Sequence, residues 1–129
     1  NFLLENGYVP VIGCMCSSEK GEALNVDGDR VAVSVATQIK ADKFISLTDV
    51  EGIYQNLETK EVIPELTVVG AESMLKTTKV EGGMKKKVYA AVEAIKHGVK
   101  EFHIYSGQVE SPITDILEKG KGTTIKNIK

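Results

Sequence analysis

Residues 80–88 have the sequence VEGGMKKKV, in which two glycines are followed by three lysines. Apolar residues then recur every three or four positions from residue 88 to residue 95, which is the spacing of one helical face. Gly98 follows this run at the position expected of a C-terminal cap. The pattern predicts a helix over residues 84–97 with the three lysines in its first turn.

Positive charge is unfavourable at that end of a helix, because the backbone dipole already makes the N-terminus positive. A bound phosphate would neutralise the lysines, since glycines admit an anion to the free backbone N–H groups. The other interpretation is a solvated basic turn at an exposed helix end. This segment alone leaves both interpretations open.

The composition is that of one small α/β domain that does not bind nucleic acid. The 129 residues include 16 basic and 18 acidic side chains, so no polyanion-binding surface is expected. No apolar run approaches the roughly 18 residues of a membrane span, and no signal peptide is expected. Cys14 and Cys16 lack the further ligands of a zinc site, so no metal site is expected. Two free thiols favour a reducing compartment, the cytoplasm.

Helical and extended patterns alternate along the chain, which predicts a βαβ-type layered sheet. Helices are expected at residues 29–39, 71–76, 84–97 and 113–118, and strands at residues 8–15, 43–47, 101–105 and 123–125. Residues 57–60 are expected to form a hairpin-like loop, and residues 77–83 a mobile loop.

Four stretches are candidates for chemistry, namely residues 25–29, 48–54, 82–87 and 106–107. Ligands of open α/β sheets bind at the carboxyl ends of strands, where two of these stretches fall. Phosphoryl transfer needs positive groups on the phosphoryl and fixed geometry between donor and acceptor. Taken alone, Asp29 is more often a helix cap, and Asn25 and Asp49 are more often turn residues. The hypothesis of phosphoryl transfer rests on their occurring together.

The motifs at these positions resemble the amino acid kinase family. They are T-D-V-x-G-I-Y at residues 48–54, G-G-M-x-x-K at 82–87 and G-T-x-I at 122–125, in the order found in that family. L-N-V-D-G-D at residues 24–29 resembles acetylglutamate kinases and their relatives that act on carrier-protein-linked aminoadipate or glutamate. The resemblance implies a layered α/β/α sandwich with a mostly parallel central sheet.

The resemblance also implies a role for each matching residue. Lys87 would stabilise the transferring phosphoryl group, Asp29 would orient the catalytic lysines, and Asn25 would bind the acceptor. The nucleotide would be bound by Thr48, Asp49, Val50, Gly52, Ile53 and Tyr54, with Met84 and Lys85 nearby. ATP with Mg²⁺ would be the phosphoryl donor, and the acceptor would be the side-chain carboxylate of an N-blocked acidic amino acid.

The sequence lacks the N-terminal half of the family, with its lysine-bearing, glycine-rich strand end. We therefore expect residues 1–129 to be a single domain, the C-terminal, ATP-binding part of a longer, homo-oligomeric kinase, inactive by itself. Three alternatives stay open: a kinase for another acceptor such as carbamate, uridylate or isopentenyl phosphate, a non-catalytic nucleotide-binding module, and a plain structural domain.

Overall fold

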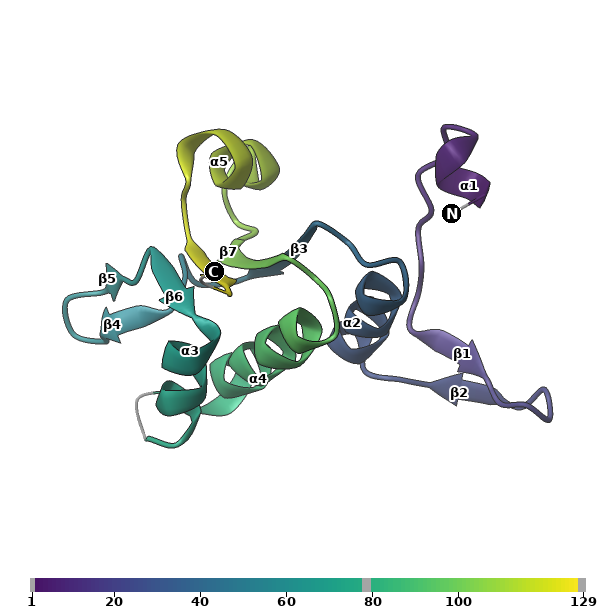
Figure 1. The fold of residues 1–129 in the computed structure, drawn as a ribbon, viewed down its shortest axis with the longest axis horizontal. Helices are drawn as coiled ribbons and strands as arrows, with labels where there is room; N and C mark the ends of the chain where they lie inside the picture. Colours follow the sequence, from purple (N-terminus) through teal and green to yellow (C-terminus); the bar gives the residue numbers. More distant parts are fainter. Residues whose placement is uncertain (1, 78–79, 128–129) are drawn as a thin grey trace.

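The computed structural model describes residues 2–77 and 80–127 and is organised around a four-stranded sheet (Figure 1). The strand order is β3-β7-β8-β6. The outer pairs are parallel, and the central β7–β8 pair is antiparallel. The predicted mostly parallel sheet is therefore confirmed. The strands are β3 (Lys43–Thr48), β6 (Glu65–Thr67), β7 (Glu101–Ser106) and β8 (Thr123–Lys126).

Helices cover both faces of this sheet, which confirms the predicted α/β/α layers (Figure 1). One face carries α2 (Gly28–Gln38), α3 (Val68–Leu75) and α4 (Gly82–Lys96). On the other face α5 (Pro112–Lys119) contacts β7, and the Tyr105 hydroxyl donates to Asp115 Oδ2 at 3.4 Å. None of the helices within the described residues is both long and apolar enough to cross a membrane.

The core lies between the sheet and the layer of three helices. Phe44 and Phe102 stack across β3 and β7 with ring centroids 4.5 Å apart. The apolar face of α4 packs onto them with its fully buried Val88 and Ala91. The helical spacing seen in the sequence therefore corresponds to the buried face of α4.

Side chains at the helix starts explain where two of these helices begin. Asp27 Oδ1 accepts a hydrogen bond of 3.1 Å from the Arg30 N–H, so Asp27 rather than Asp29 is the N-cap of α2. Thr67 caps α3 in the same way, accepting from the Gly70 N–H at 2.9 Å. Asp29 thus remains free for another role.

The N-terminal part differs from the prediction. Helix α1 (Phe2–Glu5) is present. The prediction of a strand at residues 8–15 is wrong, because the strand formed in this region of the described chain is β1 (Met15–Ser17). It pairs with β2 (Ala23–Asn25), a strand that was not predicted, in a hairpin at the edge of the molecule (Figure 1). A strand needs a neighbouring strand to bond with, and within the described residues none pairs with residues 8–14. Val11 is consequently 97% exposed.

Two further expectations need adjustment. Helix α4 begins at Gly82, so Lys85 is its fourth residue and the lysines occupy the second turn rather than the first. The loop expected at residues 77–83 includes residues 78 and 79, which lie outside the described part of the chain. The hairpin-like loop is confirmed, since it joins β4 (Tyr54–Asn56) to β5 (Glu61–Val62).

Candidate functional site

Three elements meet at the side chain of Lys87. Its Nζ lies 3.2 Å from Asp29 Oδ2, in the first turn of α2, and 3.2 Å from Ser46 Oγ, in the middle of β3. The Lys87 side chain is 16% exposed, the Asp29 side chain is 54% exposed, and Ser46 is buried. The structure therefore brings together the two residues predicted to be catalytic, which are 58 positions apart in the sequence.

Ser46 was not predicted as a site residue. A signal for it exists in the sequence, because it is a polar residue within the apolar strand Phe44-Ile45-Ser46-Leu47. A buried hydroxyl needs a hydrogen-bonding partner, so a serine on a core-facing position indicates a polar group opposite it. No sequence pattern identifies this group as the Lys87 ammonium.

The second predicted stretch forms the turn that follows the carboxyl end of β3. Gly52 is buried with φ +152°, and a Cβ there would lie 2.7 Å from Val62 Cγ1 and 2.8 Å from Thr123 Oγ1. The Ile53 N–H donates a buried hydrogen bond of 2.8 Å to the same Thr123 hydroxyl. The conformation of the turn is therefore held by Thr123 in β8, which lies 70 residues later in the sequence.

The turn after β7 lies beside the turn after β3. The Gly107 N–H donates to the Thr48 carbonyl at 2.8 Å, and the Thr48 hydroxyl donates to Asp49 Oδ1 at 3.1 Å. Asp49 is exposed, and Val50 and Tyr54 are half-buried. Because β3 and β7 are parallel neighbours, their carboxyl ends form one continuous polar edge of the sheet.

The N-terminus of α4 is open toward solvent. Among the described residues, its N-cap Glu81 makes no side-chain capping hydrogen bond, and nothing lies within 4 Å of a Cβ placed on Gly82 or Gly83. The first N–H groups of a helix lack partners inside the helix, so these can receive an anion. An anion bound there would lie at the N-terminus of the same helix that carries Lys87.

Other predicted residues are placed differently. The Ile53 side chain is wholly buried in the core, and Met84 is partly buried and packs against the core. Asn25 is exposed on the β1–β2 hairpin, opposite Met15. Lys85 is exposed and lines a groove of about 1220 Å³ between α2, α3 and α4, which also includes Asp29 and Gly82.

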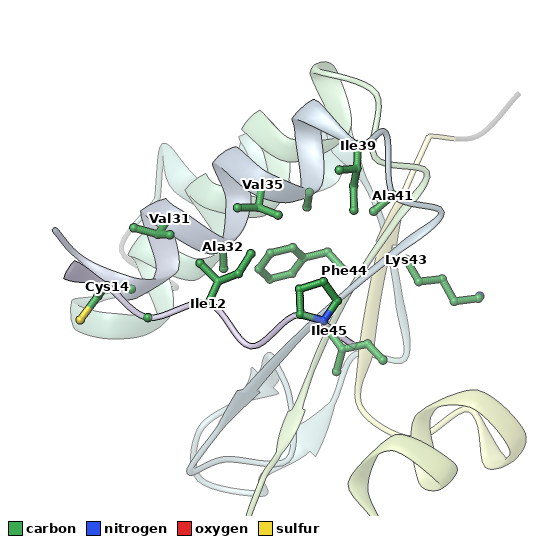
Figure 2. Close-up of a pocket in the computed structure, with 14 residues that line it drawn as sticks. Ile12, Cys14, Val31, Ala32, Val35, Ile39, Ala41, Lys43, Phe44 and Ile45 are labelled. Carbon is green, nitrogen blue, oxygen red and sulfur yellow. The ribbon is translucent and has the colours of Figure 1, made fainter. Parts of the chain in front are cut away.

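A second hollow, of about 330 Å³, has the wrong chemistry for a phosphate (Figure 2). It lies between α2, β3 and the extended segment that precedes β1, and Figure 2 shows mainly aliphatic side chains around it, with Phe44. Lys43 stands at its edge, and its ammonium pairs with Glu101. This hollow therefore does not extend the polar site.

The opposite face of the sheet contains a second polar cluster. The imidazole of His103 lies between Thr124 Oγ1, 3.0 Å from Nδ1, and Glu101 Oε2, 3.1 Å from Nε2. Burial lowers the pKa of His103, and the hydrogen bond to Glu101 opposes that shift. The Lys43 ammonium lowers the pKa of the Glu101 carboxyl. This cluster satisfies a buried histidine and lies on the face away from Lys87.

The sequence is similar to known amino acid kinases over most of its length. The model of the amino acid kinase family matches residues 1–106. The acetylglutamate kinase of Methanocaldococcus jannaschii is 38% identical over 126 residues, which cover 95% of this chain and 42% of that protein. A protein of Pyrobaculum aerophilum named as a LysW-aminoadipate/LysW-glutamate kinase is 47% identical over 119 residues, covering 92% of this chain and 44% of that protein.

Solved structures agree with the fold. N-acetylglutamate synthase from Neisseria gonorrhoeae, complexed with coenzyme A and L-arginine, matches with a TM-score of 0.88 and 25% identity over 98% of this chain and 30% of that one. Carbamate kinase from Giardia lamblia bound to AMP-PNP matches with a TM-score of 0.71 and 22% identity over 88% of this chain and 41% of that one. The chain spans less than half the length of each of these four proteins.

Proposed function

Because this chain belongs to the amino acid kinase family, we propose that it supplies the nucleotide-binding part of an ATP-dependent kinase. The observation that supports this most directly is the contact of Lys87 with Asp29 beside the open N-terminus of α4. A cation fixed next to free backbone N–H groups is suited to the phosphates of a nucleotide. The polar edge formed by the turns after β3 and β7 would hold the ribose and adenine.

The acceptor in this proposal is the side-chain carboxylate of an N-blocked acidic amino acid. The names of the relatives support this choice, since they include acetylglutamate kinase and LysW-aminoadipate/LysW-glutamate kinase. Asn25 would bind the α-carboxylate side of the acceptor. Residues outside this chain would form much of that pocket, because the relatives are more than twice as long as the part matched here. The reaction would belong to arginine or lysine biosynthesis in the cytoplasm.

The proposed chemistry requires no general base. An acidic side chain with a pKa of about 4.3 is already ionised at neutral pH, so its oxygen can attack the γ-phosphorus of ATP directly. The bond from that phosphorus to the bridging oxygen breaks, and ADP leaves with the electron pair. Lys87 would neutralise charge on the transferring group, and Asp29 would keep the ammonium in place.

The donor set of this chain is compatible with Mg²⁺ brought in by ATP. Mg²⁺ in kinases is usually held by nucleotide phosphates, waters and one or two carboxylates, and it neutralises phosphate charge. Within residues 2–77 and 80–127 there is no cluster of three or more His, Cys, Asp or Glu side chains that could hold a metal alone. The nucleotide phosphates and waters would therefore carry most of the coordination of Mg²⁺.

Calorimetric titration with AMP-PNP and Mg²⁺ tests the nucleotide site, using both this chain and the full-length protein. We expect saturable binding that is weakened in Tyr54→Ala and, to a smaller extent, in Lys87→Ala. The control is Lys100→Ala, which removes an exposed lysine paired with Asp42 at the other end of β3 and should leave binding unchanged. Absence of binding to the full-length protein at millimolar nucleotide would contradict the proposal.

A kinase assay on the full-length protein tests the acceptor. We expect ATP-dependent formation of an acyl phosphate, which is trapped with hydroxylamine as a hydroxamate. Asn25→Ala should raise the KM for the acylamino acid without changing the KM for ATP. An Asn25→Ala enzyme with unchanged affinity for the acylamino acid would contradict the assignment and favour carbamate or another acceptor.

A further inference from the structure

Ser46 occupies an unusual place for a polar residue. It lies on the core-facing side of β3, between Phe44, which stacks on Phe102, and the turn that begins after Thr48. It is 5% exposed, and its hydroxyl lies 3.2 Å from Lys87 Nζ. An apolar residue at this position would fill the core equally well, so the hydroxyl requires an explanation.

The geometry around the Lys87 ammonium explains the presence of the Ser46 hydroxyl. A lysine ammonium has three N–H donors and no acceptor. Two of them are directed to Asp29 Oδ2 and Ser46 Oγ, each at 3.2 Å. With two partners fixed on different elements, the ammonium can no longer rotate or swing freely. Within the part of the chain that the structure describes, its third N–H has no partner and is left for an anion.

The two partners differ in rigidity. Asp29 is more than half exposed, so its carboxylate competes with water and dissolved ions for Lys87. Ser46 is buried in a strand whose six residues all pair in register with β7. The hydroxyl is therefore the better-fixed of the two anchors.

We propose that Ser46 is a positioning residue, which fixes the Lys87 ammonium to the strand that leads into residues 49–53, the turn proposed to bind the nucleotide and called the nucleotide turn below. Thr48 follows Ser46 by two residues on the same face of β3, about 6.6 Å further along the strand. One rigid strand thus carries both the lysine anchor and the start of the predicted nucleotide turn. This inference rests on the proposed kinase function, which gives the position of Lys87 its importance.

The test compares three substitutions of Ser46 in the full-length protein. Ser46→Ala removes the acceptor and leaves a small void, Ser46→Cys removes the strong acceptor but keeps the volume, and Ser46→Thr keeps the hydroxyl. We expect kcat to fall about tenfold in the Ala and Cys variants, with the KM for ATP changed less than about twofold, and to recover in the Thr variant. The control is Thr124→Val, which removes a sheet hydroxyl on the opposite face and should leave kcat unchanged.

Salt provides a readout that a merely structural serine would not affect. In Ser46→Ala the lysine depends on the exposed Asp29 alone, so raising salt from about 50 mM to about 500 mM should lower kcat several-fold more than in the wild type. If Ser46→Ala and Ser46→Cys keep the wild-type kcat and salt response, the proposal is wrong while the kinase function stands. If only the Ala variant is impaired, the void is responsible and the proposal is also wrong.

A measurement without catalysis separates this inference from the proposed function. Side-chain ¹⁵N relaxation of the Lys87 ammonium reports its order directly. We expect a well-ordered ammonium in the wild type and in Ser46→Thr, and increased motion in Ser46→Ala and Ser46→Cys. Unchanged order in all four proteins would overturn the anchoring role even in an active enzyme. A change in order would support the anchoring even if the wild type lacked kinase activity.

Discussion

The ammonium of Lys87 lies 3.2 Å from Oδ2 of Asp29, which joins α4 to the first turn of α2. Ion pairs with one half-exposed partner rarely contribute more than about 1 kcal/mol to folding, because water and salt screen them. Stability is therefore a weak reason for this contact. Orientation of the lysine is the stronger reason, and the predictions below separate the two.

Replacement of Lys87 by alanine should lower kcat of the full-length protein by at least about a hundredfold, because the transferring phosphoryl loses its positive partner. The KM for ATP should change much less, since other residues of the turn hold the nucleotide. Steady-state kinetics measure both. Lys86→Ala is the matched control, because Lys86 is an exposed neighbour on the same helix turn. Equal effects in the two variants would argue against a specific role of Lys87.

Substitution of Asp27 should affect the stability of the fold, whereas substitution of Asp29 should affect catalysis. Asp27→Ala removes the N-cap of α2 and should reduce the free energy of unfolding by about 0.5–2 kcal/mol with little change in kcat. Asp29→Asn should leave the free energy of unfolding almost unchanged and lower kcat, because Lys87 loses its charged partner. Urea unfolding and kinetics on both variants check this. An Asp29→Asn enzyme with wild-type kcat would remove Asp29 from the mechanism.

Gly52→Ala should destabilise the turn after β3. The new methyl group would lie 2.7 Å from Val62 Cγ1 and 2.8 Å from Thr123 Oγ1, at a φ of +152° that side chains rarely adopt. We expect a loss of about 2–4 kcal/mol in the free energy of unfolding, together with weaker nucleotide binding. Gly21→Ala at the hairpin tip is the control, since its φ is also positive but nothing lies within 4 Å. A loss of the same size in both variants would mean that backbone strain alone is responsible.

His103 should make the protein less stable in mild acid. Its pKa is lowered in the folded state, so the unfolded chain binds more protons as the pH falls below the ordinary histidine value of 6.5. This contribution to stability is complete above that value and is lost as the pH falls through the lower pKa of the folded state. Urea unfolding at about pH 7.5 and about pH 5.5, above the range in which Glu101 titrates, should show the loss.

His103→Gln is the matched variant, because glutamine keeps hydrogen-bonding groups and does not titrate. Its free energy of unfolding should depend less on pH over the same interval. The loss of unfolding free energy of the wild type between the two pH values should exceed that of the variant by no more than about 1.4 kcal/mol for each tenfold weakening of proton binding to His103 in the folded state. Identical pH dependence in the two proteins would show that His103 does not titrate on unfolding in this range.

The sequence predicted most of the layered core, because helical spacing and short apolar strands are local signals. The buried faces of α2 and α4, the strands β3 and β7 and the helix after Pro112 all follow from such patterns. The prediction of a strand at residues 8–15 was wrong for a non-local reason. A β-rich segment becomes a strand only where a neighbour bonds to it, and residues 8–14 lie beside no such neighbour within the described residues.

The residues of the candidate site could be proposed from the sequence, but their geometry could not. Asp29 and Lys87 could be identified from their motifs, whereas Ser46 as the second partner of Lys87 depends on which residue of β3 faces α4. The buried place of Ile53 and the distance of Asn25 from the sheet likewise depend on tertiary packing. Their functional roles, like those of the other site residues, remain predictions for the experiments above.

The bond from the Ile53 N–H to the Thr123 hydroxyl has a consequence for synthesis of the protein. A ribosome makes the turn after β3 some 70 residues before it makes the strand that holds that turn in shape. A nascent chain that already contains Lys87 and Asp29 would therefore still lack a finished nucleotide turn. We expect the nascent chain to bind ATP only late in translation, after β8 has been made and has paired with β7.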